Sequence, residues 1–322
     1  MRIQVRDREL GKYFRTMLED RLPDDELHWV DPDTPAPLTG AEVFIGPRFT
    51  AADAGTADRL RLVQVAGAGL DAIDLSALPP GAACANLYRH EHSIAEYALA
   101  ATVLLRRDLL VQDRGLRDGR WLTPSRSPGM QHGRDLRSAR VGFIGFGHIG
   151  RTCWNLFRAA GVAAGAAVSL SGASGRPLDG LEWWDDLDRL DDLCAASDVI
   201  ILSLPAEQGT LDLIGAAQLE ALGPDGILVN VGRGPVVSQD ALYEALSSGA
   251  IKGAAIDVWY HYPAGSEVVA PADHDFGALP NVLMTPHVSG ATRETHLARL
   301  DDIVENIERL RTGRPLLNLV TG

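Results

Sequence analysis

A glycine-rich loop constrains the fold of this 322-residue chain more than any other feature. The apolar run VGFIGF leads into Gly145-Phe-Gly147-His-Ile-Gly150, and a helical segment is expected near residues 149–160. Gly145 allows a tight turn, Gly147 lets backbone amides approach a pyrophosphate, and Gly150 permits close packing of the helix on the strand. The helix N-terminus then faces the anion. The loop predicts a dinucleotide site that includes Gly145, Gly147, His148, Ile149 and Gly150.

Short apolar runs alternate with helical segments after this loop. The runs are AAVSL, DVIILSLP, GILVNVG, GAAIDVW and NVLMTPH, and helices are expected between them near 186–196, 215–222 and 238–248. Strands separated by helices of this length are typical of a parallel sheet that is covered on both faces. We therefore expect a doubly wound α/β domain.

The first hundred residues show a shorter alternation of the same kind. Apolar runs at 3–5, 43–45 and 62–65 are separated by helical or Pro-rich pieces, which indicates a second, smaller α/β domain. Ser93 and Glu96 have the spacing of a capping box, which predicts that a long buried helix starts there. Residues 121–140 are expected to form a connector, and residues 291–313 a further helix.

Composition and charge argue against several kinds of function. The formal net charge of -13 repels phosphate backbones, no apolar stretch of about 18 residues is present to span a bilayer, and the N-terminus lacks the apolar core of a signal peptide. We expect a cytoplasmic protein without nucleic-acid or membrane partners. Cys84, Cys153 and Cys194 are far apart and odd in number, which favours reduced thiols. His90 and His92 alone do not predict a metal site.

The end of the second strand of the doubly wound domain lacks the acid that usually binds the ribose hydroxyls of NAD. The sequence there is AAVSLSGASGR, which offers Ser169, Ser171 and then Arg176. An acid would repel a 2'-phosphate, whereas hydroxyls and a guanidinium can bind one. NAD and NADP both remain open as cofactors, with a slight preference for NADP.

Two charged or titratable residues follow later strands of this domain. Arg233 stands between two glycines after ILVNV, and His287 follows NVLMT and a proline. Open α/β sheets bind ligands at the carboxyl ends of their strands. A guanidinium can hold a carboxylate by two parallel hydrogen bonds, and an imidazole can exchange a proton near neutral pH. We expect the two residues to meet at one site.

The sequence resembles the D-isomer-specific 2-hydroxyacid dehydrogenases. The matching words are GFIGFGHIG (142–150), VNVGRGPVV (229–237), GAAIDVW (253–259) and TPHVSGAT (285–292), together with AGAGLDAID (66–74) and SIAEYAL (93–99). They occur in the order of the family and cover most of the chain.

The resemblance implies two Rossmann-like or flavodoxin-like domains with doubly wound parallel sheets. A discontinuous substrate domain of residues 1–100 and 292–322 would clasp a dinucleotide-binding domain of residues 101–291, in a homodimer. It implies that Arg233 holds the carboxylate of a 2-oxo acid while His287 carries the proton and NAD(P)H supplies the hydride. The loop Gly67, Ala68 and Gly69 would cradle the same carboxylate. The remaining cofactor residues would be Leu204, Pro205, Val231, Asp257, Ser289 and Gly290.

The sequence departs from the family at two places. In the segment DVWYHYP the residue before the proline is Tyr262, where the family has a glutamate that bonds the catalytic histidine and raises its pKa. A phenol is neutral at pH 7, so it can orient His287 but cannot stabilise imidazolium by charge. His90 replaces an asparagine that touches the substrate in many relatives. His90 and Tyr88 are candidates for lining the substrate pocket, and a solvated loop is the alternative.

Two other functions fit parts of the pattern. The words DVW and MTPHVSGAT, with a non-acidic residue before the proline, locally resemble the formate dehydrogenase subfamily, in which hydride transfer needs no proton. The C-terminal-binding-protein corepressors also resemble this chain and suggest a non-catalytic, dinucleotide-sensing module, although they keep the acid that Tyr262 replaces. The sequence does not define the substrate side chain.

Overall fold

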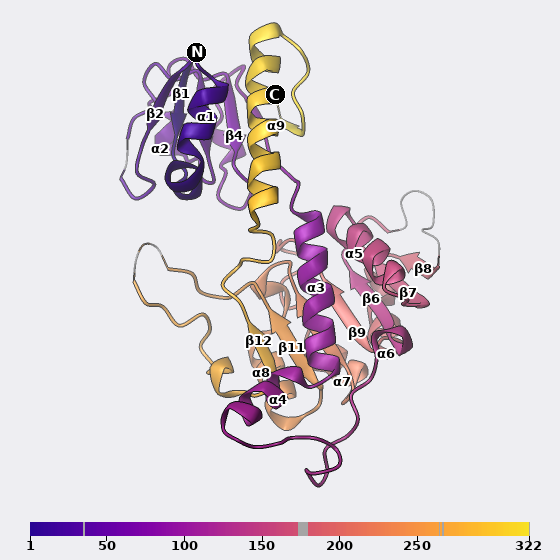
Figure 1. The fold of residues 1–322 in the computed structure, drawn as a ribbon. Helices are drawn as coiled ribbons and strands as arrows, with labels where there is room; N and C mark the ends of the chain where they lie inside the picture. The colour runs from indigo at the N-terminus through magenta and orange to yellow at the C-terminus, as the bar shows by residue number, and fades with distance from the viewer. Residues whose placement is uncertain (35, 173–179, 264, 266, 322) are drawn as a thin grey trace. The chain divides into compact units, whose positions relative to one another are not determined.

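The computed structural model describes residues 1–34, 36–172, 180–263, 265 and 267–321. Its contacts divide the chain into two compact units (Figure 1): unit 1 combines residues 1–89 with 293–322, and unit 2 spans residues 90–292. The boundary expected after residue 100 falls inside helix α3 (Glu91–Arg106), which belongs entirely to unit 2. The chain therefore passes between the units at 89–90 and again at 292–293.

Unit 2 is built on a parallel sheet of seven strands. In sheet order they are β12 (Val282–Met284), β11 (Gly253–Ile256), β10 (Ile227–Asn230), β9 (Val199–Leu202), β6 (Arg140–Ile144), β7 (Ala164–Val168) and β8 (Leu181–Asp185). The order reverses between β6 and β9, because β7 and β8 add on one side of β6 and β9 to β12 on the other. That reversal is the switch point at which open α/β sheets bind ligands.

Helices cover both faces of this sheet because the strand side chains alternate between the faces. Helices α3 and α5 (His148–Ala159) pack on one face through residues such as Ala98 and Trp154. Helices α6 (Leu190–Ala195), α7 (Ala216–Leu222) and α8 (Gln239–Ser248) pack on the other. Short 3-10 helices η3 (Leu136–Ser138), η4 (Leu187–Arg189), η5 (Gly234–Val236) and η6 (Phe276–Ala278) and helix α4 (Leu109–Arg117) complete the unit.

The start of α3 differs from the expectation. The helix begins at Glu91 with His90 as its N-cap, and no capping box forms at Ser93. The Ser93 hydroxyl instead lies 2.8 Å from the hydroxyl of Thr292. The capping prediction was wrong because the S-x-x-E spacing also occurs inside a helix, where Ser93 is used for a tertiary contact.

Unit 1 has a smaller sheet with the order β13 (Leu319–Thr321), β5 (Ala83–Ala85), β4 (Leu62–Val65), β3 (Val43–Gly46), β1 (Arg2–Val5) and β2 (Glu26–Trp29). Strands β1 to β5 are parallel in the order 2-1-3-4-5 of flavodoxin-like folds, and β13 pairs with β5 in the antiparallel direction. The predicted class of two parallel α/β domains is therefore confirmed.

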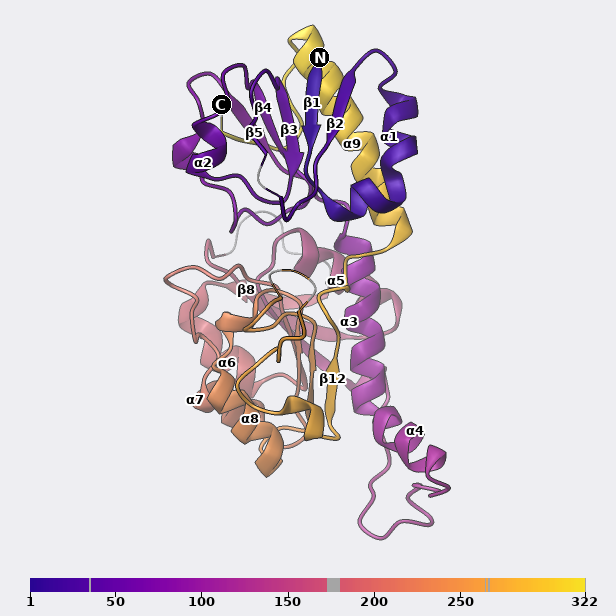
Figure 2. The same ribbon diagram turned by 90° about the vertical axis from the view of Figure 1, so that its left-hand side faces the viewer.

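Both faces of the smaller sheet are also covered. Figure 2 shows α1 (Arg15–Arg21) and α9 (Arg293–Thr312) on one face and α2 (Ala51–Ala54) on the other. On the first face, Leu300 and Ile303 of α9 are fully buried against Val5 and Ile45. The π-helix η1 (Leu10–Phe14) and the 3-10 helix η2 (Leu75–Ala77) lie in the connections. No helix among the described residues is long and apolar enough to cross a membrane.

Candidate active site

The glycine loop has the geometry that a pyrophosphate requires. Gly145 has φ +92, and a Cβ there would lie 3.0 Å from the backbone of Ser203. A Cβ on Gly150 would lie 2.4 Å from the Gly145 carbonyl oxygen, whereas a Cβ on Gly147, the N-cap of α5, would meet no atom of the described residues within 4 Å. The loop is thus tight toward the protein and open at Gly147, next to exposed His148 and half-buried Ile149. These features fit a dinucleotide at the helix N-terminus.

The residues after β7 are arranged differently from the expectation. Ser169 is buried, donates its hydroxyl proton to the Gly172 carbonyl at 2.9 Å, and accepts the indole N–H of Trp184 at 2.9 Å. Its one proton is therefore used within the turn. Ser171 is exposed, and Arg176 lies outside the described residues.

The strands beside the switch point bring the next group of predicted cofactor residues to the same edge. Leu204 and exposed Pro205 follow β9, and buried Val231 follows β10. A Cβ on Gly232 would lie 2.5 Å from the Leu204 carbonyl oxygen, so the two loops touch. The carboxyl ends of β6, β9 and β10 therefore form one continuous edge.

Arg233 is positioned by a buried asparagine at the end of β10. The Asn230 side chain is 2% exposed, accepts the amide of Gly232 at 3.1 Å, and donates to the carbonyl of Arg233 at 3.1 Å. These two bonds fix the backbone on both sides of the guanidinium. Sequence reasoning missed Asn230, although a polar residue at the end of the apolar run ILVN was the available signal.

His287 is held by Asp257, which follows β11 and is completely buried. The carboxylate accepts the hydroxyl of Thr285 at 2.6 Å and the amides of Val288 and Ser289 at 2.9 Å, and the Asp257 carbonyl accepts the amide of His287 at 2.8 Å. His287 has φ +59, which a non-glycine residue adopts only when the surroundings impose it. Asp257 therefore sets the backbone that presents the imidazole.

Tyr262 contacts the imidazole directly. Its hydroxyl oxygen lies 3.2 Å from His287 Nδ1 and accepts the backbone amide of Trp259 at 3.0 Å. Burial raises the pKa of the Tyr262 phenol, while the Trp259 amide and the charge of Arg233 oppose that rise. The phenol stays protonated at neutral pH. Because Arg233 acts on the phenol that touches His287, the structure brings these three predicted residues into one electrostatic environment.

The neutral imidazole has a preferred tautomer in this arrangement. The phenol oxygen already accepts the Trp259 amide, so donating its own proton to Nδ1 satisfies both groups. The imidazole proton then sits on Nε2.

A second tyrosine supports the same loop from α3. The hydroxyls of Tyr97 and Thr285 lie 2.8 Å apart, and Thr285 donates to Asp257, so Tyr97 is the donor in the first contact. Burial raises the pKa of Tyr97 to about 12. Trp259 adds a bond from its indole N–H to the Thr285 carbonyl at 2.8 Å. No sequence motif signals these hydrogen bonds, because Tyr97, Asp257 and Thr285 are far apart in the chain.

His90 and Gly290 are also neighbours in unit 2. A Cβ on Gly290 would lie 3.1 Å from the Cβ of His90, the N-cap of α3. Ser289, between Gly290 and the His287 loop, is buried. Among the described residues, no three His, Cys, Asp or Glu side chains converge on a metal position.

In unit 1 the loop Gly67 to Gly69 follows β4. The Gly67 carbonyl accepts the amide of Leu87 at 2.9 Å, and the Ala68 carbonyl accepts the Asn86 side chain at 2.9 Å. In a trans peptide the next N–H points away from the carbonyl, so the amides of Ala68 and Gly69 point away from Asn86 and Leu87. That direction suits anion binding.

Tyr88 and Arg89 are tied to α9. The Tyr88 carbonyl accepts Nε of Arg299 at 3.0 Å, and Arg89, with φ +76, makes two bonds of 2.8 Å to Asp302. The Asp302 side chain is 7% exposed. Arg89 therefore fixes the passage between the units to α9, which favours a structural role for it over a place in a substrate pocket.

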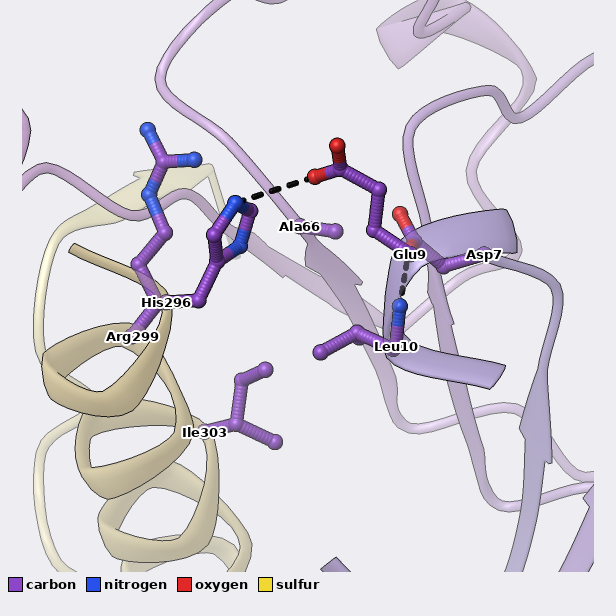
Figure 3. Close-up of a pocket in the computed structure, with 7 residues that line it drawn as sticks. All are labelled: Asp7, Glu9, Leu10, Ala66, His296, Arg299 and Ile303. Carbon is purple, nitrogen blue, oxygen red and sulfur yellow. Dashed lines mark hydrogen bonds and ion pairs between the residues drawn. The ribbon is translucent and has the colours of Figure 1, made fainter. Parts of the chain in front are cut away.

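A small cavity of about 40 Å³ lies in unit 1 between η1 and α9 (Figure 3). Glu9 and His296 form an ion pair of 3.0 Å across it, and Asp7 accepts the amide of Leu10 at 2.8 Å. Burial raises the pKa of Asp7. The lining residues are Asp7, Glu9, Leu10, Ala66, His296, Arg299 and Ile303. Ala66 directly precedes the Gly67 loop.

A doubly wound seven-stranded unit with this glycine loop, joined to a smaller flavodoxin-like unit, defines the class of two-domain dinucleotide-dependent oxidoreductases. The model of the D-isomer specific 2-hydroxyacid dehydrogenase NAD binding domain matches residues 99–289. The chain belongs to the D-isomer specific 2-hydroxyacid dehydrogenase family, and with that family it is an NAD(P)-dependent oxidoreductase. The resemblance seen in the sequence is confirmed.

Individual relatives differ in length from this chain. It is 32% identical over 266 residues to D-3-phosphoglycerate dehydrogenase of Archaeoglobus fulgidus, covering 82% of this chain but 48% of that protein. It is 31% identical over 263 residues to 2-ketogluconate reductase of Gluconobacter oxydans, covering 81% and 79%. A solved D-isomer specific 2-hydroxyacid dehydrogenase of Xanthobacter autotrophicus, in complex with NADPH and MES, has a TM-score of 0.80 at 26% identity, covering 99% of this chain and 97% of that one.

Proposed function

We propose that this protein transfers a hydride between NAD(P)H and a 2-oxo acid, forming the D-2-hydroxy acid or running in reverse. The hydride comes from the nicotinamide of the bound cofactor. The observation that carries the proposal is the fixed group of Tyr262, His287 and Asp257 at the carboxyl edge of the unit 2 sheet, beside Arg233. Within the family, the reaction needs a proton carrier and a carboxylate clamp at this edge.

Each residue has a defined part in the proposed reaction. The Arg233 guanidinium binds the substrate carboxylate by two parallel hydrogen bonds. In unit 1, the family resemblance assigns carboxylate binding to the loop of Gly67, Ala68 and Gly69. His287 Nε2 donates a hydrogen bond to the substrate carbonyl and passes its proton to the oxygen as hydride adds to carbon. His90 in unit 2 and Tyr88 in unit 1 are the candidates for contacts to the substrate side chain.

Tyr262 in place of a glutamate changes the stability of the protonated form of His287. When His287 is imidazolium, Nδ1–H must donate to the phenol oxygen, which carries no charge to stabilise it. A carboxylate partner at this place would stabilise imidazolium by charge. The proposed acid is thus available over a lower pH range than with a glutamate partner.

The remaining residues assigned to the cofactor would bind it and would take no part in proton transfer. Gly145, Gly147, His148, Ile149 and Gly150 would hold the pyrophosphate, while Leu204, Pro205 and Val231 would line the nicotinamide side with Ser289 and Gly290. Asp257 is the family aspartate near the carboxamide, and its bonds to Thr285 and Ser289 make it a positioning residue. NADP is the preferred cofactor, since no acid stands among residues 169–172.

We propose that the protein forms a homodimer and that it is located in the cytoplasm. Leu116 and Trp121 are 52% and 65% exposed on α4 and the segment after it, which extends away from the sheet of unit 2 (Figure 2). Large exposed apolar side chains on a projecting segment favour a protein contact. The three cysteines are free and buried, and thiols without a disulfide partner suit a reducing compartment.

Formate oxidation is the second candidate, because the uncharged Tyr262 would do no harm to a reaction that moves a hydride without a proton. One assay, which follows the oxidation or reduction of the nicotinamide cofactor, tests both 2-oxo acid reduction and formate oxidation. We expect NADPH or NADH to be oxidised with glyoxylate, hydroxypyruvate, pyruvate or phenylpyruvate, and NAD(P) not to be reduced with formate. Reduction with formate alone would assign the second function. Tight cofactor binding without turnover of either kind would assign a dinucleotide-sensing module.

A further inference from the structure

The turn that carries Tyr262 (residues 259–262, the Tyr262 turn) is held by hydrogen bonds more than by burial. Tyr262 is 50% exposed, and His261 and Pro263 on either side of it are also exposed. The turn closes on itself where the Tyr262 hydroxyl accepts the amide of Trp259 at 3.0 Å. An exposed turn gains little from apolar burial, so bonds to a rigid part of unit 2 must limit its conformational freedom.

The Tyr262 turn is bonded to the chain where it returns at Pro271. The amides of Tyr260 and His261 both donate to the Pro271 carbonyl, at 3.1 and 3.0 Å. The His261 side chain adds a contact of 3.0 Å between Nε2 and the Asp273 carboxylate. An exposed pair of this kind contributes little by itself. These bonds therefore fix the turn only if Asp273 is itself held in place.

Gln239, the first residue of α8, holds Asp273 by two bonds. Its Nε2 donates to the Asp273 carboxylate at 2.8 Å, and its Oε1 accepts the backbone amide of Asp273 at 2.8 Å. The carboxylate meets Gln239 through one oxygen and His261 through the other. The Gln239 amide, and then His261, hold the pKa of the Asp273 carboxyl below its usual value, so this group is ionised at neutral pH. Gln239 is thus linked to the Tyr262 turn through a single carboxylate.

The start of α8 is a rigid base for these contacts. His274 lies on the ring of Tyr243 with 4.5 Å between the centroids, and its Nε2 lies 2.7 Å from the Asp240 carboxylate. Phe276 is fully buried and meets the Tyr243 ring edge to face. Asp273 therefore directly precedes a segment that is packed on α8.

A second anchor joins the Tyr262 turn to the loop that follows Arg233. The Tyr260 hydroxyl donates to the Val237 carbonyl at 2.9 Å. A Cβ on Gly234 would lie 2.4 Å from the Trp259 carbonyl oxygen, so the loop and the turn are in close contact. Loss of the Gln239 bonds would leave this anchor intact, and a partial displacement of the turn is therefore expected.

We propose that Gln239, acting through Asp273, positions Tyr262 against His287 and so holds the imidazole for proton transfer. Gln239 is a positioning residue, because it acts through the Tyr262 turn. The expected effect on kcat rests on the proposed function. The expected effect on the contact of 3.2 Å between the Tyr262 hydroxyl and His287 Nδ1 does not.

The first test needs neither cofactor nor substrate. The ring-nitrogen NMR shifts of labelled histidine report the hydrogen bond at Nδ1, and the His287 signals in the full chain are assigned as those lost in His287→Gln. Tyr262→Phe should move the Nδ1 signal, and Gln239→Ala should move it in the same direction by a smaller amount. An Nδ1 signal that stays in place in either variant would overturn the proposal.

The second test is a double-mutant cycle on kcat with NADPH and one 2-oxo acid. Gln239→Ala should lower kcat roughly two- to tenfold with little change in KM, since one or two hydrogen bonds are lost and the imidazole is less well held. In the Tyr262→Phe background the same change should lower kcat by less than about twofold, because the contact through which Gln239 acts is already gone. Losses that simply multiply in the double variant would contradict the proposal.

An exchange of the two partners provides the rescue. Gln239→Glu alone places two carboxylates against each other and should lower kcat at least as far as Gln239→Ala. With Asp273→Asn added, the side-chain amide at position 273 donates to the carboxylate at position 239, so both bonds return. We expect kcat to recover toward the wild-type value. A double variant no faster than Gln239→Glu would show that these two bonds are not the cause.

Gln218 provides the matched control. At the start of α7 it also donates its side-chain amide to a carboxylate, that of Asp191 at 2.8 Å, and accepts a backbone amide, that of Gly215 at 3.0 Å. Gln218→Ala therefore removes the same two kinds of bond elsewhere in unit 2, and it should leave kcat and the His287 signals unchanged. Thermal melting of each variant separates unfolding from lost positioning. A wild type without turnover would contradict only the proposed reaction, because the NMR test still decides the role of Gln239.

Discussion

Tyr262 stands where the family resemblance places a glutamate, and the proposed proton transfer depends on this difference. Its hydroxyl lies 3.2 Å from His287 Nδ1 and is held by the Trp259 amide, so it orients the imidazole as a glutamate would. Burial raises the pKa of the phenol, which keeps it neutral. In the proposed reaction, Tyr262 therefore still orients the His287 imidazole, but it cannot stabilise the imidazolium form by charge.

Replacing Tyr262 by glutamate should restore the charge. In the reducing direction the acid form of His287 is required, so kcat/KM falls as pH rises through the pKa of this residue. A carboxylate at position 262 stabilises imidazolium, and the fall should move to higher pH by about one unit. The measurement is the pH profile of kcat/KM for wild type and Tyr262→Glu. Tyr262→Phe is the control, and its profile should not move upward. Coincident profiles for wild type and Tyr262→Glu would remove this residue from proton transfer.

The residues predicted from the sequence were those with a motif around them. Arg233 and His287 each follow an apolar run that is recognisable as a strand of a parallel α/β sheet. Their position at the carboxyl edge of that sheet could therefore be inferred. The roles of Tyr97 and Thr285 could not be inferred, because the hydrogen bond between their hydroxyls joins residues 188 positions apart. Asn230 was missed although its bonds to Gly232 and Arg233 are local. Ser169 was expected at the cofactor, but its hydroxyl is used inside its own turn.

At the scale of elements, the glycines of the loop before α5 have two different reasons to be glycine. One is close packing within the protein, and the other is room for a ligand. Gly150 is required by the protein itself, since a Cβ there would lie 2.4 Å from the Gly145 carbonyl oxygen. Gly147 has no such neighbour among the residues that the structure describes, so the protein itself does not require a glycine there, and we propose that the ligand does.

The two glycines should therefore respond differently to alanine. Gly150→Ala should lower the free energy of unfolding by about 1–3 kcal/mol, because the helix or the loop must shift. Gly147→Ala should leave stability within about 0.5 kcal/mol and weaken NADPH binding. Chemical denaturation and calorimetry measure the two quantities. If both variants lost stability equally, Gly147 would not be a ligand-facing position.

Helix α3 reaches the active site through Tyr97. Tyr97→Phe removes the bond to Thr285 that supports Asp257 and the His287 loop. We expect kcat to fall roughly tenfold with little change in KM, since the imidazole is less well held while Arg233 is untouched. Steady-state kinetics with one 2-oxo acid and saturating NADPH provides the measurement. A rise in KM at constant kcat would contradict a positioning role.

The pattern of elements was more predictable than their ends. The strands at 199–202 and 227–230 are fully buried and read as continuous apolar runs, which is why they were recognised. Strand β8 was missed because Leu181–Asp185 carries two tryptophans and two acids at the edge of the sheet. The start of α3 was misplaced because a capping spacing inside a helix looks the same as one at its end.

At the scale of the molecule, the division into two units follows from which segments share a core. Helix α9 buries Leu300, Ile303 and Ile307 against the first sheet, so the last thirty residues join the first eighty-nine. The sequence alone indicated two domains, and the discontinuity came from the family resemblance. The exact passage at residue 89 depends on Arg89 and Asp302, which lie 213 positions apart.

The proposed homodimer makes a prediction at this scale. Light scattering coupled to size exclusion should give the mass of two 34.5 kDa chains for the wild type. Trp121→Ser should shift the population toward one chain at micromolar concentration, because it removes the largest exposed apolar side chain of the projecting segment. Tyr13→Ser is the control, since Tyr13 is 64% exposed in unit 1. A wild type that runs as one chain would contradict the dimer.

The most direct test of the account is the rate of NADPH oxidation with glyoxylate and hydroxypyruvate for wild type, Arg233→Ala and His287→Ala. We predict turnover of at least one of these acids by the wild type, a fall in kcat of about 100- to 10,000-fold in His287→Ala, and a large rise in KM in Arg233→Ala. An His287→Ala variant that kept the wild-type rate on a substrate that the wild type reduces would contradict the assignment of the proton carrier and of the site.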